Sequence, residues 1–497
     1  MKNIIVKPYF SLESFRYAIF ALFYLFCVWM VLVHLKSASP AILSAGILSI
    51  AGILVLSWFN ILLSLGCFII LIPLVSGLYQ VGFLPVNPLT FWFAAIYVSW
   101  FIKRIFWDKK RIIINSGIEN AIDALSAIVL LSLAFTVFRF PVDYIGYRLW
   151  DSVATTQTDP MFSVFAAFFI LQGLFLFRLA VLEAKGKKIF KKIHLVFYFH
   201  AITIFIFSFI QLIFNIPKIR AVSFIRLNSP FDDIHSYASY VVLLFFVFLV
   251  LTFDEEKLRT KIVNGCFAGV LLTLIVLSWS RTTWISCLIV FIIFVCTKLN
   301  ARNRILLVVS ALVLFLFINM NPAILTKYSG NPYVSRFGRL VLMKNYEKDR
   351  NIQSRIFLYK RALNILQTYP ITGSGVGTFY RISPFYDEET CPYKRWPAGR
   401  ENAHNYYAQF CADLGVPALV LFLGIITCAY RKGFRGLVLY EESGTRNLLK
   451  GLLFGLSAYL ITMLTGHPLI LSSQQFLFWF VIAVISLNRD TSPFSAK

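Results

Sequence analysis

His404 is the side chain in this sequence best suited to accept a proton during a reaction. It stands in "ENAHNYYAQFCADLGVPALVLF" (401–422), where a polar, aromatic stretch runs directly into an apolar one. Histidine has an unperturbed pKa of about 6.5, so its neutral form can act as a base near neutral pH. The alternative is a structural role, which is the commoner fate of a lone histidine.

Two arginines at the ends of apolar runs could hold a phosphate. Arg281 lies in "SWSRTTW" (278–284), a turn with almost no loop around it, and Arg226 precedes another apolar run in "SFIRLNSPFDDIHSYASY" (223–240). The planar guanidinium binds phosphate oxygens in a bidentate way. For Arg281 the alternative is an arginine anchored at a membrane surface beside two tryptophans, and for Arg226 it is an ordinary loop arginine.

The "DDIH" stretch offers a different chemistry. Asp232, Asp233 and His235 could bind a divalent metal, or one carboxylate could serve as the base. Two adjacent carboxylates and one histidine provide few ligands for a metal. The eight cysteines show no CxxC or Cys/His metal spacing. We therefore predict that the protein uses no metal and no other cofactor.

The elements that carry these residues are predicted to cross a membrane. Of the 497 residues, 59% are hydrophobic and 14% are charged, whereas soluble proteins have about 45–50% and about 25%. Apolar runs of about 18 residues or more, long enough to cross a bilayer, recur along the chain. These runs are continuous and lack the alternation of a transmembrane barrel. The sequence predicts an all-α polytopic protein whose partner is the lipid bilayer, with no nucleic acid involved.

About fourteen spans are expected, with one long hydrophilic segment between the eleventh and the twelfth. We divide the chain into spans 1–11 (1–320), a large extracytoplasmic loop (321–411), and spans 12–14 with a cytoplasmic tail (412–497). The predicted spans are 17–35, 41–59, 60–78, 89–103, 119–139, 161–183, 194–216, 236–253, 263–280, 283–297, 305–320, 412–430, 449–466 and 470–488.

Loop charge predicts the orientation of these spans. Alternate loops are strongly basic, namely "KRIFWDKKR" (103–111), "KGKKIFKK" (185–192), "KLRTK" (257–261), "KLNARNR" (298–304) and "RKGFR" (431–435). Basic loops stay in the cytoplasm. Both termini then lie in the cytoplasm, and 140–160, 217–235, 280–282, 321–411 and the "GHP" turn (466–468) lie outside.

The long loop contains an amphipathic helix and a glycine-rich turn. "SRIFLYKRALNILQTYP" (354–370) has apolar residues at near-helical spacing, with Ser354 as the expected N-cap and Pro370 as the terminator. The following "ITGSGVGTF" has a GxGxG pattern, but it follows a helix rather than a strand. We interpret it as a turn that closes the helix and not as a dinucleotide site.

An anionic substrate fits this arrangement. The loop carries thirteen Lys/Arg against six Asp/Glu between 321 and 411, which suits an anionic substrate or a membrane surface. An enzyme at the outer face has no ATP, so its substrate must arrive already activated. In a membrane the natural form is a sugar linked to a polyprenyl diphosphate.

As an ordered set, the motifs resemble the O-antigen ligase/polymerase family of bacterial envelope enzymes. The resemblance covers about residues 220 to 430 and rests on "SWSRTTW", "SRIFLYKRALNILQTYPITGSGVGTF" and "ENAHNYYAQFCADLGVPALVLFL". It implies an inverting C-type membrane glycosyltransferase that moves a glycan from undecaprenyl diphosphate to an acceptor sugar. The site would face the periplasm at the bacterial inner membrane.

The resemblance also implies roles for individual residues. Arg226 and Arg281 would hold the diphosphate, Arg355 would be a loop cation near it, and His404 would activate the acceptor hydroxyl. Further substrate-binding or supporting residues would be Asn405, Tyr406, Gln409, Arg361, Asp232 and His235, with the tyrosines 406 and 407 as platforms on which sugars stack. The upstream arginine motif departs from the family, which often has Gly and Asn-Pro-Asn where this chain has Ser229 and Asp-Ile-His.

Three functions remain open at this stage. A ligase would give the glycan to lipid A-core, a polymerase would give it to another lipid-linked repeat unit, and a flippase would move a lipid-linked glycan without reacting with it. The flippase would need neither a base nor a large outer loop. Separately, Cys391 and Cys411 could form a disulfide in an oxidising compartment.

Overall fold

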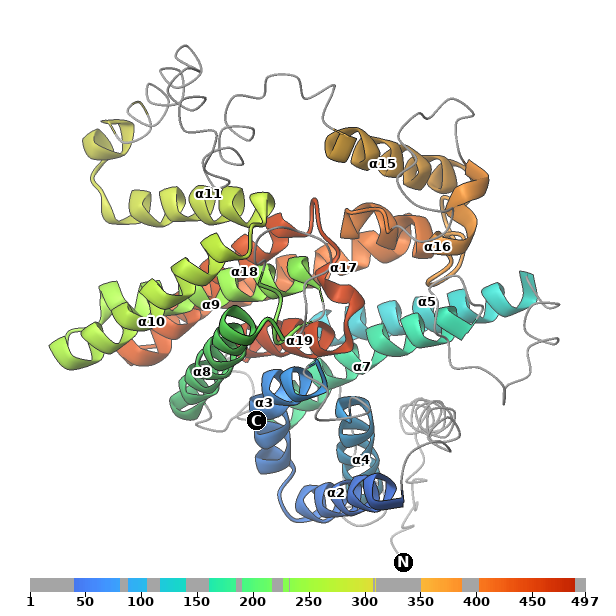
Figure 1. Cartoon of the computed structure of the whole chain (residues 1–497), viewed down its shortest axis with the longest axis horizontal. Coiled ribbons are helices and arrows are strands. Elements are labelled where there is room, and N and C mark those ends of the chain that lie inside the picture. The colour runs from blue at the N-terminus through green and yellow to red at the C-terminus, as the bar shows by residue number, and fades with distance from the viewer. Residues whose placement is uncertain are drawn as a thin grey trace, which may run out of the picture.

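The computed structural model describes residues 40–80, 88–104, 117–139, 161–184, 190–216, 227–231, 233–306, 309, 350–386 and 402–487. In those ranges all regular structure is helical (Figure 1). The bundle helices are α2 (Pro40–Phe59), α3 (Ile61–Gln80), α4 (Leu89–Ile102), α5 (Gly117–Arg139), α7 (Met161–Ala184), α8 (Phe190–Phe214), α9 (Ile234–Asp254), α10 (Leu258–Leu277), α11 (Arg281–Lys298), α17 (Tyr406–Leu439), α18 (Ser443–Thr462) and α19 (Ser472–Ser486). Between α11 and α17 lie α15 (Arg350–Thr368), α16 (Phe379–Ile382) and the 3-10 turn η4 (Ser383–Tyr386), and a second 3-10 turn, η5 (Pro468–Ile470), precedes α19.

The helices fall where the apolar runs predict them. Each predicted span from 41–59 to 283–297, and each of the last three, overlaps one bundle helix. Among the described residues, eight helices are long and apolar enough to cross a membrane, and three more apolar helices are shorter. With the composition, this identifies a polytopic helical membrane protein. The spans predicted at 17–35 and for most of 305–320 lie outside the described residues, so the count of fourteen stays a prediction.

Two groups of ion pairs join helix ends that lie beside the predicted basic loops. Asp254, at the end of α9, pairs with Lys450 of α18 (3.0 Å) and with Lys298 at the end of α11. Arg104, just past α4, pairs with Glu183 near the end of α7 (3.1 Å). These helix ends are the ones that the charge pattern assigns to a common side. We call this the basic end, and the opposite end, which holds the predicted site residues, the site end.

The centre of the bundle is α9, whose side chains from Ser236 to Val250 are all buried. It can lie so close to α18 because α18 presents glycine to it. A Cβ atom on Gly455 would lie 2.5 Å from the Leu243 carbonyl oxygen, and one on Gly451 would lie 2.8 Å from the Val247 Cα. Small residues four apart are a common device for close packing between membrane helices.

We therefore expect Gly455→Ala to loosen the α9–α18 contact. The added methyl group cannot fit without separating the helices, and overpacking of this kind costs about 1–3 kcal/mol. Thermal unfolding of the detergent-solubilised protein should show a lower midpoint. Gly269→Ala on α10 is the matched control, because a Cβ atom there meets nothing within 4 Å. Equal midpoints for the two variants would contradict the packing explanation.

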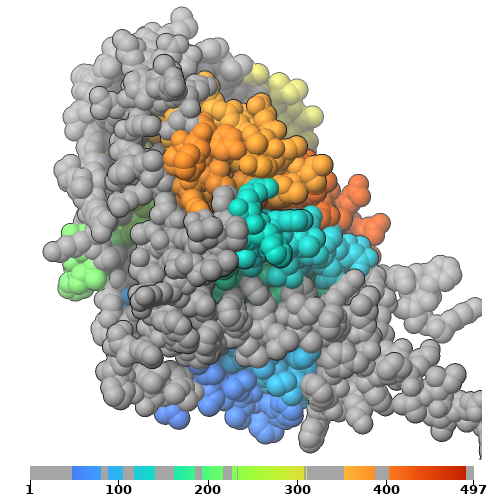
Figure 2. All heavy atoms as spheres, turned by 90° about the vertical axis from the view of Figure 1, so that its right-hand side faces the viewer, coloured from blue at the N-terminus to red at the C-terminus, as the bar shows by residue number. Residues whose placement is uncertain are grey.

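A second, smaller core lies at the site end. It is built from α15, α16 and the start of α17, and its buried members are Ala362, Ile365, Phe379, Ile382, Ala403 and Ala412. Figure 1 shows α15 and α16 beside α17, and Figure 2 shows this orange segment stacked on the cyan end of α5. The Arg139 side chain of α5 makes the join by donating to the Ser374 carbonyl oxygen (2.9 Å) and lying over the Tyr369 ring.

The predicted N-cap of the amphipathic helix is wrong. The amphipathic helix begins at Arg350, so Ser354 is a buried residue inside α15 and not its N-cap. The chain upstream of Ser354 continues the helix, which a capping signal alone cannot exclude. The helix that contains the predicted span 412–430 starts at Tyr406 with Asn405 as its N-cap, and the loop boundary at 411 stays a prediction.

Candidate active site

Residues 463–470, which we call the connector, join α18 to α19 and organise the site end. The start of α9 is fixed to this region by two side-chain contacts. The Ser236 hydroxyl donates to the Pro468 carbonyl oxygen (3.1 Å), and the Ser239 and Thr462 hydroxyls hydrogen-bond each other (2.6 Å). The "GHP" turn, which the sequence predicts to lie outside, therefore also anchors the start of α9. The sequence analysis does not predict this contact.

Three further elements meet the connector. The backbone amide of Tyr406 donates to the carbonyl oxygens of Met463 (3.0 Å) and Gly466 (3.1 Å), which fixes the start of α17. Thr282, next to Arg281 at the start of α11, hydrogen-bonds Thr465. The connector thus brings together the helix ends that carry Arg281, His235 and His404.

The α15 helix reaches the same place through Tyr359. Its hydroxyl is within hydrogen-bond distance of the carbonyl oxygens of Leu464 (3.2 Å) and His404 (3.3 Å). Arg355 lies one helical turn before Tyr359, and its charge is felt by both Tyr359 and His404. Arg355 and His404, to which the resemblance gives roles in one site, therefore lie near each other in space.

His404 stands in a tight turn with an unusual backbone. Its φ angle is 47°, a left-handed conformation that non-glycine residues rarely adopt. Local hydrogen bonds hold the turn: the His404 amide donates to the Asn402 side-chain oxygen (2.8 Å), and the Asn405 side chain caps α17 by accepting from the Ala408 amide (3.0 Å). The ring of His404 lies edge-to-face with that of His235, with centroids 6.1 Å apart. Strained backbone of this kind is common at functional sites.

Burial and nearby charge keep His404 neutral. Burial is the largest cause that lowers its pKa, followed by the charges of Arg355 and His235, while Asp233 acts in the opposite direction; the resulting pKa is about 3. Burial also lowers the pKa of His467, in the connector, to about 4. At neutral pH both rings are therefore uncharged, and each can accept a proton only at a cost.

The remaining predicted residues have varied surroundings. Arg361 is buried with its guanidinium 4.4 Å from the Phe357 ring. Asp233, next to the predicted Asp232, caps α9 by accepting from the Ser236 amide (2.7 Å). Arg226 and Asp232 lie outside the described residues. Within the described part of the chain, no three His, Cys, Asp or Glu side chains are arranged to hold a metal ion.

Tyr406 does not form an open platform, whereas Tyr407 is partly exposed. Tyr406 is only 4% exposed and packs against Phe410, Phe422 and the His467 ring. The Tyr407 hydroxyl donates to the Leu460 carbonyl oxygen (3.0 Å). The prediction of a sugar-stacking platform fails for Tyr406, because its ring is packed inside the protein and has no open face for a sugar. Cys411 is buried and Cys391 lies outside the described residues, so their disulfide stays a prediction.

The glycine-rich segment is a turn, as predicted, and it pairs with a break in α17. Gly415 has φ 84° and ψ 170°, and Pro417 lacks an amide hydrogen, so carbonyl groups one turn earlier lose their helical donors. Residues 370–375 take their place. The amides of residues 374 and 375 donate to the carbonyl oxygens of residues 412 (2.9 Å) and 413 (3.0 Å), and the residue 416 amide donates to that of residue 370 (2.9 Å).

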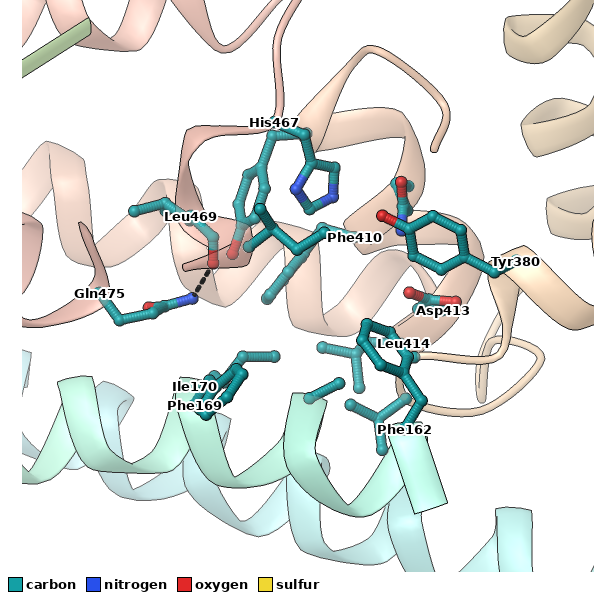
Figure 3. A pocket seen from close by; sticks show the side chains of 16 residues that line it. Phe162, Phe169, Ile170, Tyr380, Phe410, Asp413, Leu414, His467, Leu469 and Gln475 are labelled. Atoms are coloured by element: carbon teal, nitrogen blue, oxygen red, sulfur yellow. Dashed lines mark hydrogen bonds between the residues drawn. The ribbon is translucent and has the colours of Figure 1, made fainter. Parts of the chain in front are cut away.

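A small cavity lies directly behind the His404 turn. It has a volume of about 50 Å³, room for one or two water molecules. Figure 3 shows Tyr380, Asp413, His467 and Gln475 around it, with apolar side chains of α7 on the other side. Asp413, which the sequence analysis did not single out, is buried there. Its only sequence signal is an acid in an apolar stretch at the start of a predicted span, where burial of a charge is costly.

One family model matches the part of the chain that carries several of these residues. Residues 266–423 match the family model described as O-antigen ligase. The matched range includes α11 with Arg281, α15 with Arg355, the glycine-rich turn and the His404 turn. No curated protein matches the chain. The resemblance seen in the sequence is thereby confirmed over this range.

Proposed function

We propose that this chain, which carries a domain of the O-antigen ligase family over residues 266–423, transfers a glycan from undecaprenyl diphosphate to an acceptor sugar. The observation that carries the proposal is the convergence on the connector of the His404 turn, the Arg281 end of α11 and α15 with Arg355. This convergence lies at the site end, which the charge pattern assigns to the outer face of the bacterial inner membrane. The acceptor that we favour is lipid A-core, as in a ligase.

In the proposed mechanism the arginines and His404 divide the work. Arg281 and Arg355, with Arg226 upstream, hold the diphosphate and stabilise the charge that develops on it as the sugar–phosphate bond breaks. Preorganised charges of this kind often contribute most to catalysis. His404, uncharged before the reaction, takes the proton of the acceptor hydroxyl as that oxygen attacks the anomeric carbon from the opposite side, which inverts the configuration.

Binding of the donor would also adjust the base. Arg355 is among the charges that lower the pKa of His404. A diphosphate beside Arg355 would compensate its charge and raise the basicity of His404 toward the range useful for proton transfer. His404 would then become an effective base when the donor is in place.

The decisive experiment supplies purified full-length protein with the lipid-linked donor and, in separate reactions, with lipid A-core or with no second acceptor. Glycan on lipid A-core identifies a ligase, and lengthened lipid-linked glycan without lipid A-core identifies a polymerase. Failure to convert the donor in either reaction contradicts the proposal and favours the flippase. Deletion of the gene adds the cellular result: a ligase mutant accumulates lipid-linked polymer, and a polymerase mutant carries a single repeat.

The low pKa of His404 predicts an unusual pH dependence. In the donor-free protein the neutral form persists well below pH 6.5, because the pKa is about 3. We therefore expect kcat/KM to stay nearly constant as the pH falls from 7.5 to 5.5. A loss of activity centred on pH 6.5 in the wild type would contradict this environment for His404.

Stability should change in that same range with a definite sign. Unfolded histidine has a pKa of about 6.5, whereas His404 and His467 have pKa values of about 3 and about 4 in the fold. Below pH 6.5 the unfolded chain binds protons that the folded chain does not, so the free energy of unfolding should decrease as the pH falls. Thermal unfolding between pH 7.5 and 5 measures this decrease.

A further inference from the structure

Backbone amides in and just after the glycine-rich turn point to the carboxyl group of Asp413. Asp413 is buried, and its Oδ1 accepts from the Phe379 amide (2.9 Å). The amides of Gly377 and Thr378 also hydrogen-bond to this carboxylate. Successive amides that converge on one anion resemble the nests with which glycine-rich loops bind phosphate. Here the group that they surround is an internal carboxyl group.

The carboxylate is linked to the His404 turn by one residue. Gln409, one turn before Asp413 on α17, hydrogen-bonds Asp413 with its side chain. The Gln409 Oε1 atom accepts from the Ala403 amide (3.0 Å). Ala403 directly precedes His404, so a chain of hydrogen bonds runs from the glycine-rich turn to the backbone of the candidate base.

We propose that Asp413 is a positioning residue for His404, acting through Gln409 and the Ala403 amide. This inference rests on the proposed function, because it assumes that His404 reacts with the acceptor. A left-handed backbone at a histidine persists only where its surroundings hold it. The chain from Asp413 to Ala403 supplies that hold from inside the protein, and the connector supplies it from the other side through Tyr359.

The chemistry of the link requires a carboxylate at one end and an amide at the other. Both oxygens of the Asp413 carboxyl group can accept hydrogen bonds, so it can receive the Phe379 amide and the Gln409 NH₂ group together. In Asp413→Asn the new NH₂ group would face those donors, and in Gln409→Glu two carboxylates would face each other. Both changes break the link while altering shape very little.

The test compares these variants with the exchanged pair. We expect Asp413→Asn and Gln409→Glu each to lower kcat at least tenfold with little change in the donor KM. In Asp413→Asn/Gln409→Glu the new asparagine donates to the new glutamate, which still accepts from the Ala403 amide. The kcat of the double variant should therefore exceed that of either single variant.

A matched control separates positioning from stability of the turn. Ser374 lies in the same turn but outside the chain of hydrogen bonds from Asp413 to Ala403. Ser374→Ala removes the hydroxyl that hydrogen-bonds the Thr378 hydroxyl (2.7 Å) and the Ala412 carbonyl oxygen. It should lower the midpoint of thermal unfolding and keep kcat.

Three results would overturn the inference while leaving the proposed function intact. They are full kcat in Asp413→Asn, a double variant as slow as the product of the two single effects, and equal loss of kcat in Ser374→Ala. A wild-type protein that converts no donor would instead overturn the proposed function. Thermal unfolding of every variant identifies any that fail to fold. If a single variant fails to fold, recovery of folding and kcat in Asp413→Asn/Gln409→Glu still shows that the two positions are coupled.

Discussion

Replacement of His404 by alanine is expected to lower kcat about 10²–10⁴-fold, the usual contribution of a positioned general base. The donor KM should change little, because the proposed diphosphate contacts come from Arg281 and Arg355. The side chain is partly buried, and its removal leaves the backbone hydrogen bonds of the turn in place, so the protein should still fold. Initial rates with purified lipid-linked donor and acceptor measure the effect.

The kinetics of Arg281→Ala are needed for comparison, because they separate loss of the base from loss of diphosphate binding. It should raise the donor KM and lower kcat as well, since it removes a charge that both binds the diphosphate and stabilises its departure. A His404→Ala variant with nearly normal transfer, next to an impaired Arg281→Ala variant, would show that the arginines carry the chemistry and that the acceptor hydroxyl needs no base from His404.

The helices of this fold can be predicted from the sequence, because an apolar run long enough to cross a membrane must satisfy its own backbone hydrogen bonds as a helix. Loop charge is also a local property, so it predicts which helix ends share a side of the membrane without knowledge of the fold. The resemblance implies that Arg355 and His404 serve the same site, and the Tyr359 hydroxyl, one turn after Arg355, lies within hydrogen-bond distance of the His404 carbonyl oxygen. The neighbours of His404 on other helices could be expected only in outline.

The missed features depend on contacts between distant segments. Asp413 receives an amide 34 positions earlier in the chain, from Phe379, and nothing near Asp413 in the sequence announces that partner. The connector owes its role to contacts from four distant segments, made by Ser236, Thr282, Tyr359 and Tyr406. The predicted start of α15 is wrong for the opposite reason: Ser354 is a local capping signal, but the helix continues upstream of it to Arg350.

Gly415→Ala is expected to be the most destabilising small substitution at the site end. With φ 84° and ψ 170°, Gly415 occupies a region that is essentially restricted to glycine. A Cβ atom there would lie 2.1 Å from the Ile371 carbonyl oxygen, and backbone cannot move aside as a flexible side chain can. Backbone strain of about 1–3 kcal/mol and overpacking of about 1–3 kcal/mol together predict a loss of about 2–6 kcal/mol.

Gly424→Ala in the same helix is the matched control, because a Cβ atom there meets nothing within 4 Å. Glycine in a helix interior costs roughly 0.5–1 kcal/mol relative to alanine, so the control should be neutral or slightly stabilised. Thermal unfolding, and the yield of monodisperse protein where unfolding is irreversible, should separate the two variants clearly. If Gly415→Ala matched the control, residues 370–375 could not be packed against the α17 break. The link from Asp413 to His404 would then lose its support, because that same packing brings the Phe379 amide to the Asp413 carboxylate.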